Sequence, residues 1–257
     1  MEILHRTAGM VVHRAESIEE RYADRAVYMF RYVLMFSKNG SVKYTSHLDM
    51  QRLFKRAFRR SDVDLAYSKG FNPHPKMGFA QPLSLGYEGD GEIMDFETNS
   101  GIDGGSFIKE VAGNLPSGIS LLKLGMLGDG TKSPAAALDA AEYKVYIPLP
   151  FDAHRMEEDV SRYMRQEEII TLKKVKKSKE LKSVDIKSKI RSLTSFETCD
   201  GTTGLTMLLD CGSRSNLSAE AVISTFLEFT DLRCGRYEIE VCRSKLIFEL
   251  DYPIDWL

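Results

Sequence analysis

Apolar residues recur every three or four positions between residues 46 and 60, which is the spacing of one buried stripe on an α-helix. The stripe consists of Met50, Leu53, Phe54, Ala57 and Phe58. Basic residues recur at the same spacing on a different face, at Arg52, Lys55, Arg56 and Arg59. The pattern therefore predicts a helix over 46–60 that packs on one side and carries a row of positive charge on another.

The rest of the first half is predicted to form strands and one more helix. The predicted order is strand, helix, strand, strand, helix, strand, over 30–37, 46–60, 63–67, 91–98, 105–114 and 119–127. A similar order follows residue 140, with an added strand in the lysine-rich region. Its strands are predicted at 142–148, 168–175, 188–197, 204–211 and 236–250, and its helices at 152–165 and 217–229. Arg243 and Ser244 mark a candidate break in the last strand.

The order βαββαβ, found twice, is typical of ferredoxin-like domains. The predicted fold class is therefore α+β, with two tandem ferredoxin-like domains. The segment GDGTKSPAAALDA, residues 128–140, mixes Gly, Pro, Ser and Ala in the manner of a linker. The predicted regions are an N-terminal extension, a first domain, a linker, and a second domain with a lysine-rich insertion, over 1–27, 28–127, 128–140 and 141–257.

The start of the 46–60 helix combines groups that bind anions. Thr45 or Ser46 can cap it, which places His47 and Asp49 in the first turn, where backbone N–H groups are free and the dipole is positive. Asp49 is spaced to orient the guanidinium group of an arginine one or two turns later. The helix residues of the predicted anion-binding surface are Ser46, His47, Asp49, Arg52, Arg56, Arg59 and Arg60. A solvated, salt-bridged helix face remains the alternative for the arginines.

The loop over residues 68–76, SKGFNPHPK, adds a second group of polar side chains. Its glycine and two prolines exclude a helix. Pro73 and Pro75 hold the preceding Asn72 and His74 in extended geometry, which lowers the entropic cost of presenting them to a ligand. The loop residues of the predicted surface are Ser68, Asn72, His74 and Lys76. Side chains that only satisfy the backbone of a tight loop are the alternative.

Several of these segments resemble a known family. The runs SHLD, RAFRR, YSKGFNPHPK and PLSLG, the last shortly before Gly91 and Glu92, resemble the radical-SAM-linked domain family, whose members are fused to, or encoded beside, radical S-adenosylmethionine enzymes. The likeness is specific over 31–97 and looser beyond residue 140, where it rests on Val184, Asp185 and Ile186. It implies a radical S-adenosylmethionine protein as partner and RNA as the substrate class. S-adenosylmethionine and an iron–sulfur cluster are then expected on that partner.

The cysteines agree with a chain that holds no cofactor of its own. Cys199, Cys211, Cys234 and Cys242 show no C-x-x-C spacing, so the chain does not by itself carry a cluster-binding motif. Scattered cysteines in a cytosolic fold are usually small buried hydrophobes. We therefore predict no metal site.

A second basic segment spans residues 173–191 and holds nine Lys and Arg residues against Glu180 and Asp185. Such density predicts a protruding hairpin or loop that reaches a polyanion. The lysines of this predicted patch are Lys173, Lys174, Lys176, Lys177 and Lys179. A solubilising surface is the alternative.

Composition limits the class of protein. With 257 residues, 43% of them hydrophobic, the chain can bury a substantial core. Its net charge is −2, so any nucleic-acid surface must arise from segregated charge. No apolar run approaches the roughly 20 residues of a membrane span, and no signal peptide is evident. A cytoplasmic protein without a membrane partner is expected.

Three functions fit this sequence. The preferred one is an accessory anion- or RNA-binding module, without catalytic activity of its own, that serves a separate radical S-adenosylmethionine enzyme in RNA modification or processing. The second is a metal-independent endoribonuclease with His47 or His74 as general base and Arg52 or Arg56 stabilising the phosphorane. The third is a protein-docking scaffold for the radical enzyme. For the first two, the helix start and the loop are expected to share one concave surface.

Overall fold

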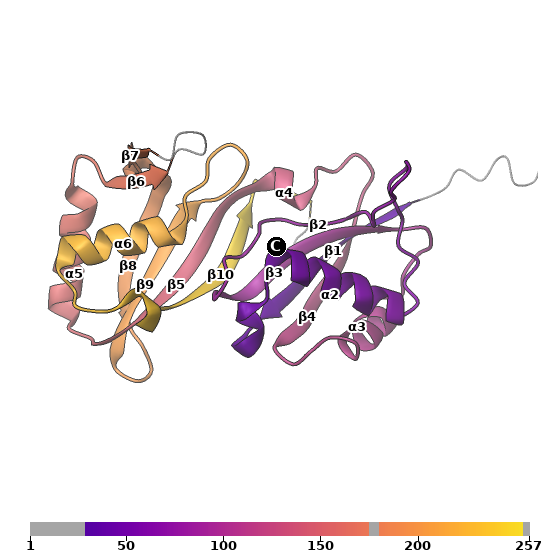
Figure 1. Ribbon diagram of the computed structural model, residues 1–257, viewed down its shortest axis with the longest axis horizontal. Coiled ribbons are helices and arrows are strands. Elements are labelled where there is room, and N and C mark those ends of the chain that lie inside the picture. The colour runs from indigo at the N-terminus through magenta and orange to yellow at the C-terminus, as the bar shows by residue number, and fades with distance from the viewer. Residues whose placement is uncertain (1–28, 175–179, 254–257) are drawn as a thin grey trace, which may run out of the picture.

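The computed structural model describes residues 29–174 and 180–253 as a mixed α/β fold with a large, mostly antiparallel sheet (Figure 1). Seven strands follow the order β4-β1-β3-β10-β5-β9-β8, and β2 pairs with β3 as the eighth. Within these residues, no helix combines the length and the apolar character needed to cross a membrane.

The first half of the chain forms one end of the sheet. Its elements are β1 (Phe30–Lys38), the 3₁₀-helix η1 (Gly40–Tyr44), α2 (His47–Arg60), β2 (Met77–Phe79), β3 (Glu88–Thr98), α3 (Gly104–Ala112) and β4 (Ile119–Leu127). Their strands lie in the order β4-β1-β3-β2, and each neighbouring pair is antiparallel.

The second half forms the other end. Its elements are α4 (Pro134–Ala137), β5 (Leu138–Pro150), α5 (Ala153–Arg165), β6 (Ile170–Lys174), β7 (Leu181–Asp185), η2 (Lys187–Lys189), β8 (Ile190–Glu197), β9 (Thr202–Asp210), α6 (Ala219–Thr230), η3 (Arg236–Glu238) and β10 (Glu240–Phe248). The order β10-β5-β9-β8 is again antiparallel throughout. Strands β6 and β7 form a separate two-stranded sheet.

The strand predicted over 63–67 is wrong. This segment makes only isolated bridges, from Leu65 to Thr98 and from Tyr67 to Pro75, while β2 takes the place beside the end of β3. The chain enters the segment through Asp62, whose φ is 49°, and it bonds to the end of β3 at a few points, where the Ala66 N–H donates to the Glu97 carbonyl at 2.8 Å and the Asp64 carbonyl accepts from the Asn99 N–H at 3.0 Å. Leu65 is nevertheless buried, which explains why the apolar pattern looked like a strand.

Other boundaries agree more closely. The predicted hairpin near 188–211 is confirmed as β8 and β9, and the predicted break in the last strand coincides with a register shift between Arg243 and Lys245. The segment 128–140, expected as a linker, contains α4 and the buried start of β5. The mixed helix and strand content is confirmed, whereas the division into two ferredoxin-like domains stays a prediction. The predicted extension 1–27 lies outside the described residues.

Aromatic side chains fix α2 and α3 on the sheet. Phe54 of α2 lies 4.9 Å, centroid to centroid, from Phe36 of β1. Phe58 lies 4.9 Å from Phe96 of β3, which stacks on Phe107 of α3 at 5.5 Å. Each fully buried phenylalanine contributes roughly 1.5 to 3 kcal/mol, so the apolar stripe of α2 anchors the helix and leaves its basic face outward.

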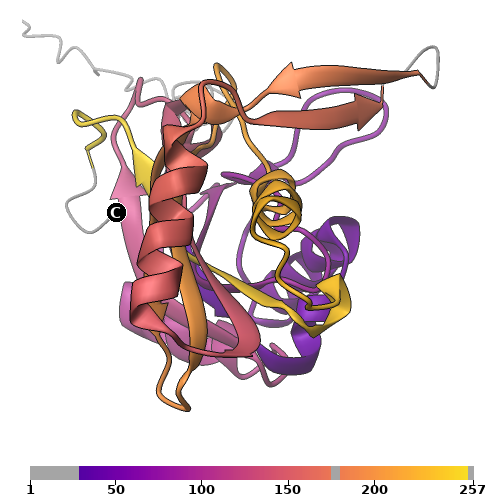
Figure 2. The same cartoon turned by 90° about the vertical axis from the view of Figure 1, so that its left-hand side faces the viewer.

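Helices of both halves cover the same face of the sheet, as α2 and α6 show in Figures 1 and 2. The second core packs α5 and α6 on β5 and β9. Within this core, a buried hydrogen bond of 2.7 Å joins the Tyr163 and Thr225 hydroxyls. The ring of Tyr163 also packs edge-on against Phe226 at 5.2 Å.

The halves meet where β10 pairs with β3 in parallel, through Cys242 with Glu88 and Arg243 with Gly89. Arg243 donates to both carboxylate oxygens of Glu92, at 2.8 and 2.5 Å. Its Nη2 also donates to the Gln81 carbonyl at 2.8 Å. Two short backbone pairings are thus reinforced by a bidentate ion pair across the junction.

Candidate functional site

The start of α2 is organised by three side chains. Ser46 caps the helix, accepting from the backbone N–H of Asp49 at 3.2 Å, and its hydroxyl donates to the Asp49 carboxylate at 2.7 Å. That carboxylate also accepts from Arg52 at 2.8 Å. The Ser46 hydroxyl, followed by Arg52, holds the pKa of Asp49 below its ordinary value. Asp49 therefore remains ionised and fixes the direction of the Arg52 guanidinium group.

An open groove runs along this side of α2. Its volume is about 670 Å³, and it lies between the helix and the turn at 113–116. The basic residues that line it are Arg52, Arg56 and Arg60, and Asn114 faces them from the turn. Lys55 and Arg59 are exposed on the same helix. In the described part of the chain, no acidic side chain pairs with Lys55, Arg56, Arg59 or Arg60. We call these four residues with Arg52 the α2 basic row.

A second hollow of about 370 Å³ lies on the neighbouring side of α2. Arg52 and Lys55 line it together with Gln51 from the helix and His74 from the loop. Arg52 therefore borders both hollows, and His74 lies beside Arg52 and Lys55 in the second.

The loop that carries His74 is closed by Ser68. The Ser68 backbone N–H donates to the His74 carbonyl at 2.8 Å, and the Ser68 hydroxyl accepts from the His74 N–H at 3.0 Å. This clasp leaves Phe71 and Asn72 exposed at the tip of the loop. Ser68 thus stabilises the loop by bonding to the backbone of His74. This local role is the alternative to ligand binding that was considered for the polar side chains of this loop. Lys76 is also engaged, because its ammonium group pairs with Glu97 at 2.7 Å.

His47 lies apart from His74. Its ring is half-buried, 5.3 Å from the Phe79 centroid in an edge-on contact, and its Nε2 is 3.3 Å from Gln51 Nε2. It lines a cavity of about 20 Å³ with Lys38 and Glu92, room for roughly one water molecule. Burial, followed by the charge of Lys38, lowers the pKa of His47.

The expectation of a single concave surface is therefore wrong in part. Arg52, Arg56 and Asp49 share the open groove, His74 shares the second hollow with Arg52, and His47 faces the small cavity. The rotation of α2 about its axis decides this, since the helix turns its first residue toward the sheet and its later arginines toward solvent.

A buried ionic cluster behind His47 escaped the sequence analysis. Lys38, Glu92 and Arg243 are exposed by only 3%, 3% and 1%. Lys38 donates to the carbonyls of Lys43 and Thr45 at 3.3 and 3.0 Å, which ties β1 to the chain entering α2. Burial lowers the pKa of Lys38, while Glu92 acts in the opposite direction. The only signal in the sequence is a charge placed within or beside each apolar strand run, which is equally typical of an exposed strand face.

The second basic patch lies at the other end of the molecule. Lys173 and Lys174 belong to β6, on the hairpin at the upper left of Figure 1, and the side chain of Lys173 is exposed. Lys176, Lys177 and Lys179 lie outside the described residues. The α2 basic row lies in the other half of the molecule, right of the centre of Figure 1, so the described part of the second patch is separate from it.

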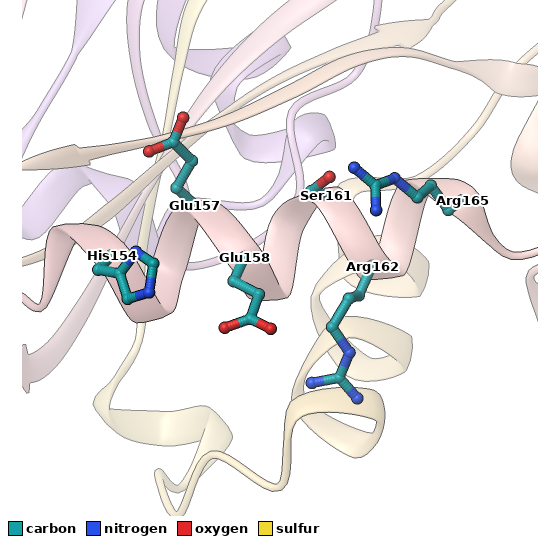
Figure 3. A pocket seen from close by; sticks show the side chains of 6 residues that line it. All are labelled: His154, Glu157, Glu158, Ser161, Arg162 and Arg165. Atoms are coloured by element: carbon teal, nitrogen blue, oxygen red, sulfur yellow. The ribbon is translucent and has the colours of Figure 1, made fainter.

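A further hollow of about 290 Å³ lies on α5 and mixes both charges (Figure 3). His154, Glu158 and Arg162 follow one another along one side of the helix, and Arg162 pairs with Asp159 at 3.5 Å. Mixed, exposed charge of this kind is typical of a solvated helix face. Among the described residues, no group of three or more His, Cys, Asp or Glu side chains could hold a metal ion.

Comparisons with known proteins place the chain in a family. No curated protein matches it in sequence. Solved structures do match it, among them two that resemble the chain weakly. "Crystal Structure of a Cbf5-Nop10-Gar1 Complex" shares 10% identity at a TM-score of 0.43 and covers 84% of this chain, which spans 48% of that one. "Crystal structure of putative glycine cleavage system transcriptional repressor" shares 11% identity at a TM-score of 0.23 and covers 86% of this chain and 99% of its own.

One protein family matches residues 31–219, most of the chain. The match includes the SHLD and GFNPHP segments, the α2 basic row and Glu92. The chain therefore belongs to the family described as "Uncharacterized protein conserved in bacteria (DUF2344)".

Proposed function

We propose that this protein is a non-catalytic module that binds single-stranded RNA through the α2 basic row. One observation carries the proposal: four cations of α2 have no acidic partner among the described residues, and a fifth, Arg52, is oriented by Asp49 at 2.8 Å. Cations of a merely salt-bridged helix face would be paired with acids. A phosphate backbone supplies the missing counter-charge and releases its own counterions on binding.

The spacing of the row suits a linear polyanion. Arg52, Arg56 and Arg60 follow one another at four-residue intervals, about 6 Å apart along the helix axis. All three border the groove of about 670 Å³. A strand laid in this groove would meet the guanidinium groups in succession.

Exposed rings lie beside the row. Tyr44, 67% exposed, precedes Thr45, which lines the groove, while Phe71 and Tyr67 project from the loop that carries His74. Aromatic rings stack on unpaired bases, and such stacking contributes about 1 to 3 kcal/mol per base. The combination of unpaired cations and exposed rings favours a single strand over a duplex, whose bases are already stacked.

We propose further that the bound RNA is presented to a separate radical S-adenosylmethionine protein. This part rests on the family resemblance and on the absence of a cluster-binding cysteine spacing in the sequence. S-adenosylmethionine and the iron–sulfur cluster would then belong to the partner. Mixing the two purified proteins with RNA tests it, since a ternary complex is expected in analytical ultracentrifugation.

We also propose that the sheet consists of two ferredoxin-like units. The orders β4-β1-β3-β2 and β10-β5-β9-β8 support this. If β6 and β7 are left out and the strands are counted within each half, both orders run fourth, first, third, second, and all neighbours are antiparallel. The short parallel contact between β3 and β10 would then be the boundary. Native-state hydrogen exchange should show two cooperative units that divide there.

The RNA proposal is tested with labelled single-stranded RNA over a series of salt concentrations. Replacing Arg52, Arg56 and Arg60 by Ala should flatten the log-affinity against log-salt slope by about 0.7 for each lost phosphate contact. The matched control is Arg165→Ala, since Arg165 is also exposed in the last turn of a helix but lies on α5. An equal loss in the control, or no retention of RNA at low salt, would contradict the proposal.

The same mixture separates binding from cutting. A nuclease would lose cleavage roughly a hundredfold or more when its general base is removed, with binding nearly intact. His47→Ala and His74→Ala should instead leave labelled RNA uncut, as in the wild type. Metal-free cleavage that depends on either histidine would replace the binding module with an endoribonuclease.

A further inference from the structure

The β6–β7 hairpin is a poorly supported element of the fold. Its two strands pair only with each other, and Figure 2 shows them extending away from the main sheet above α6. A lone two-stranded hairpin is marginally stable in water and needs a third strand or a packed face. The contacts of β6 with α6 supply part of that support.

One face of the hairpin carries three exposed aliphatic side chains. Side chains alternate along a strand, so Ile170 and Leu172 share a face. Leu172 pairs with Ser183, which makes Leu181 its diagonal neighbour on that face. Ile170, Leu172 and Leu181 are 46%, 62% and 58% exposed. Three large aliphatic side chains, which we call the apolar strip, are thus exposed on this face, where Ser183 and Asp185 lie directly opposite Leu172 and Ile170.

The other face is basic. Lys173 lies directly opposite Lys182, and cross-strand pairs of like charge destabilise a sheet. Both lysines are exposed, and within residues 29–174 and 180–253 neither pairs with an acidic side chain. Thr171 and Val184 share this face, and together with Lys173 they line a pocket beside Glu220 of α6. Lys182 lies outside that lining, so the two adjacent positive charges could be satisfied by an external carboxylate from the Lys182 side.

The outer edge of the hairpin is β7. Figure 2 shows β6 between β7 and α6, so the backbone edge of β7 away from β6 faces solvent. An unpaired edge is a template for one more strand, and main-chain hydrogen bonds then supply affinity while alternate side chains supply specificity.

We propose that β7 receives an extended segment of a partner protein in which apolar and acidic residues alternate. Added beside β7, such a strand would place its apolar side chains next to Leu181 and its carboxylates next to Lys182. One occupant then accounts for the open edge, the apolar strip and the lysine pair. This docking surface is separate from the α2 basic row and does not depend on RNA binding.

The apolar strip favours a protein over a nucleic acid. Leu172, Leu181 and Ile170 have no ring to stack on bases, and burying them against phosphates would bring no gain. They are suited instead to the desolvated centre of a protein interface, with the lysines as its polar rim. RNA binding by the lysine pair is the competing outcome of the test.

The probe is an acetylated eight-residue peptide in which valine and glutamate alternate, titrated into the full chain and followed by fluorescence anisotropy. Saturable binding is expected. A valine–lysine peptide should bind at least about tenfold more weakly, because like charges would then face Lys182. A valine–glutamate peptide N-methylated along its pairing edge should lose binding similarly, since it keeps the side chains but lacks the N–H donors. Neither control alters the fold of the protein.

Variants of the chain complete the test. Lys182→Glu should weaken the glutamate peptide about tenfold and restore the lysine peptide, whereas Lys245→Glu, another exposed strand lysine, should do neither. Leu181→Ser should weaken binding and Leu122→Ser, on β4, should not. The proposal is overturned if no peptide binds, or if N-methylation or the charge swap leaves the affinity unchanged. It is also overturned if Lys182→Glu lowers RNA retention instead, or if the hairpin pairs with a second copy of this chain.

Discussion

Arg243 and Lys38 lie inside the junction at 1% and 3% exposure, whereas Arg56 and Arg60 stand on the surface of α2. The inner pair is held by partners inside the protein: Arg243 donates to Glu92, and Lys38 donates to the carbonyls of Lys43 and Thr45. The outer pair has no acidic partner in the described chain. When a guanidinium or ammonium group is removed from water, its charge must be balanced by partners inside the protein. A group that stays in water can bind an external anion instead.

The difference assigns the two sets to separate tasks. The buried cations determine whether β3 and β10 stay together, so their removal should appear in the free energy of unfolding. The exposed cations should leave that energy unchanged and appear only in the affinity for a polyanion. The following variants test this division.

The largest effect is expected from Glu92→Ala, which leaves Arg243 charged and unpaired in the core. The free energy of unfolding should fall by about 3 to 5 kcal/mol in urea titrations. The double variant Glu92→Leu with Arg243→Met should recover most of this loss, because it removes both charges and keeps apolar volume. A Glu92→Ala protein within 1 kcal/mol of wild type would show that the pair does not hold the junction.

A smaller effect is expected at His47, where burial and then Lys38 lower the pKa. The neutral ring is favoured in the folded state, so this stabilisation is complete above the unfolded pKa near 6.5 and declines as the pH falls below it. NMR titration should give His47 a midpoint below 6.5. Lys38→Met should raise that midpoint, because a nearby positive charge is removed, and an unchanged midpoint would exclude Lys38 as a cause.

Arg56→Ala should change the unfolding free energy by no more than about 0.5 kcal/mol, since the side chain is exposed and makes no ion pair in the described chain. The same protein should show the weakened salt dependence of RNA binding proposed above. A loss of unfolding free energy beyond about 1 kcal/mol would show that Arg56 stabilises the fold, as the buried cations do.

The smallest effect is expected from Asp49→Asn. The Ser46 hydroxyl and Arg52 lower the pKa of Asp49, so its contribution is present above the unfolded value near 3.9 and is lost as the pH falls through the folded value. Wild type should therefore lose slightly more stability than the variant on acidification toward pH 2. Identical acid curves would show that Asp49 orients Arg52 without stabilising the helix.

Local pattern was sufficient for most of the elements and insufficient for their assembly. The stripe from Met50 to Phe58 predicted α2 and its buried face, and a cap was expected at Thr45 or Ser46, of which Ser46 is the cap, because both features depend on spacing within one helix. The break in the last strand near Arg243 was predicted for the same reason, since it too was inferred from local sequence. These features need no knowledge of distant residues.

The failures all concern contacts between distant segments. Leu65 is buried without joining a strand, and no periodicity distinguishes these two states. Glu92 and Arg243 look like exposed strand charges until β10 is laid beside β3. His47 and His74 were expected on one surface because one short strand was predicted to join the helix to the loop, but they line different cavities.

The junction also imposes an order on folding. Glu92 and Arg243 are 151 residues apart, so the ion pair closes one of the longest loops in the chain. During synthesis β1, β3 and β4 can assemble while part of the β3 edge is uncovered and Glu92 lacks its partner. Contacts of such separation slow folding. Docking of β10 should therefore be the late step, and a nascent chain halted before β10 should bind chaperones that recognise open strand edges.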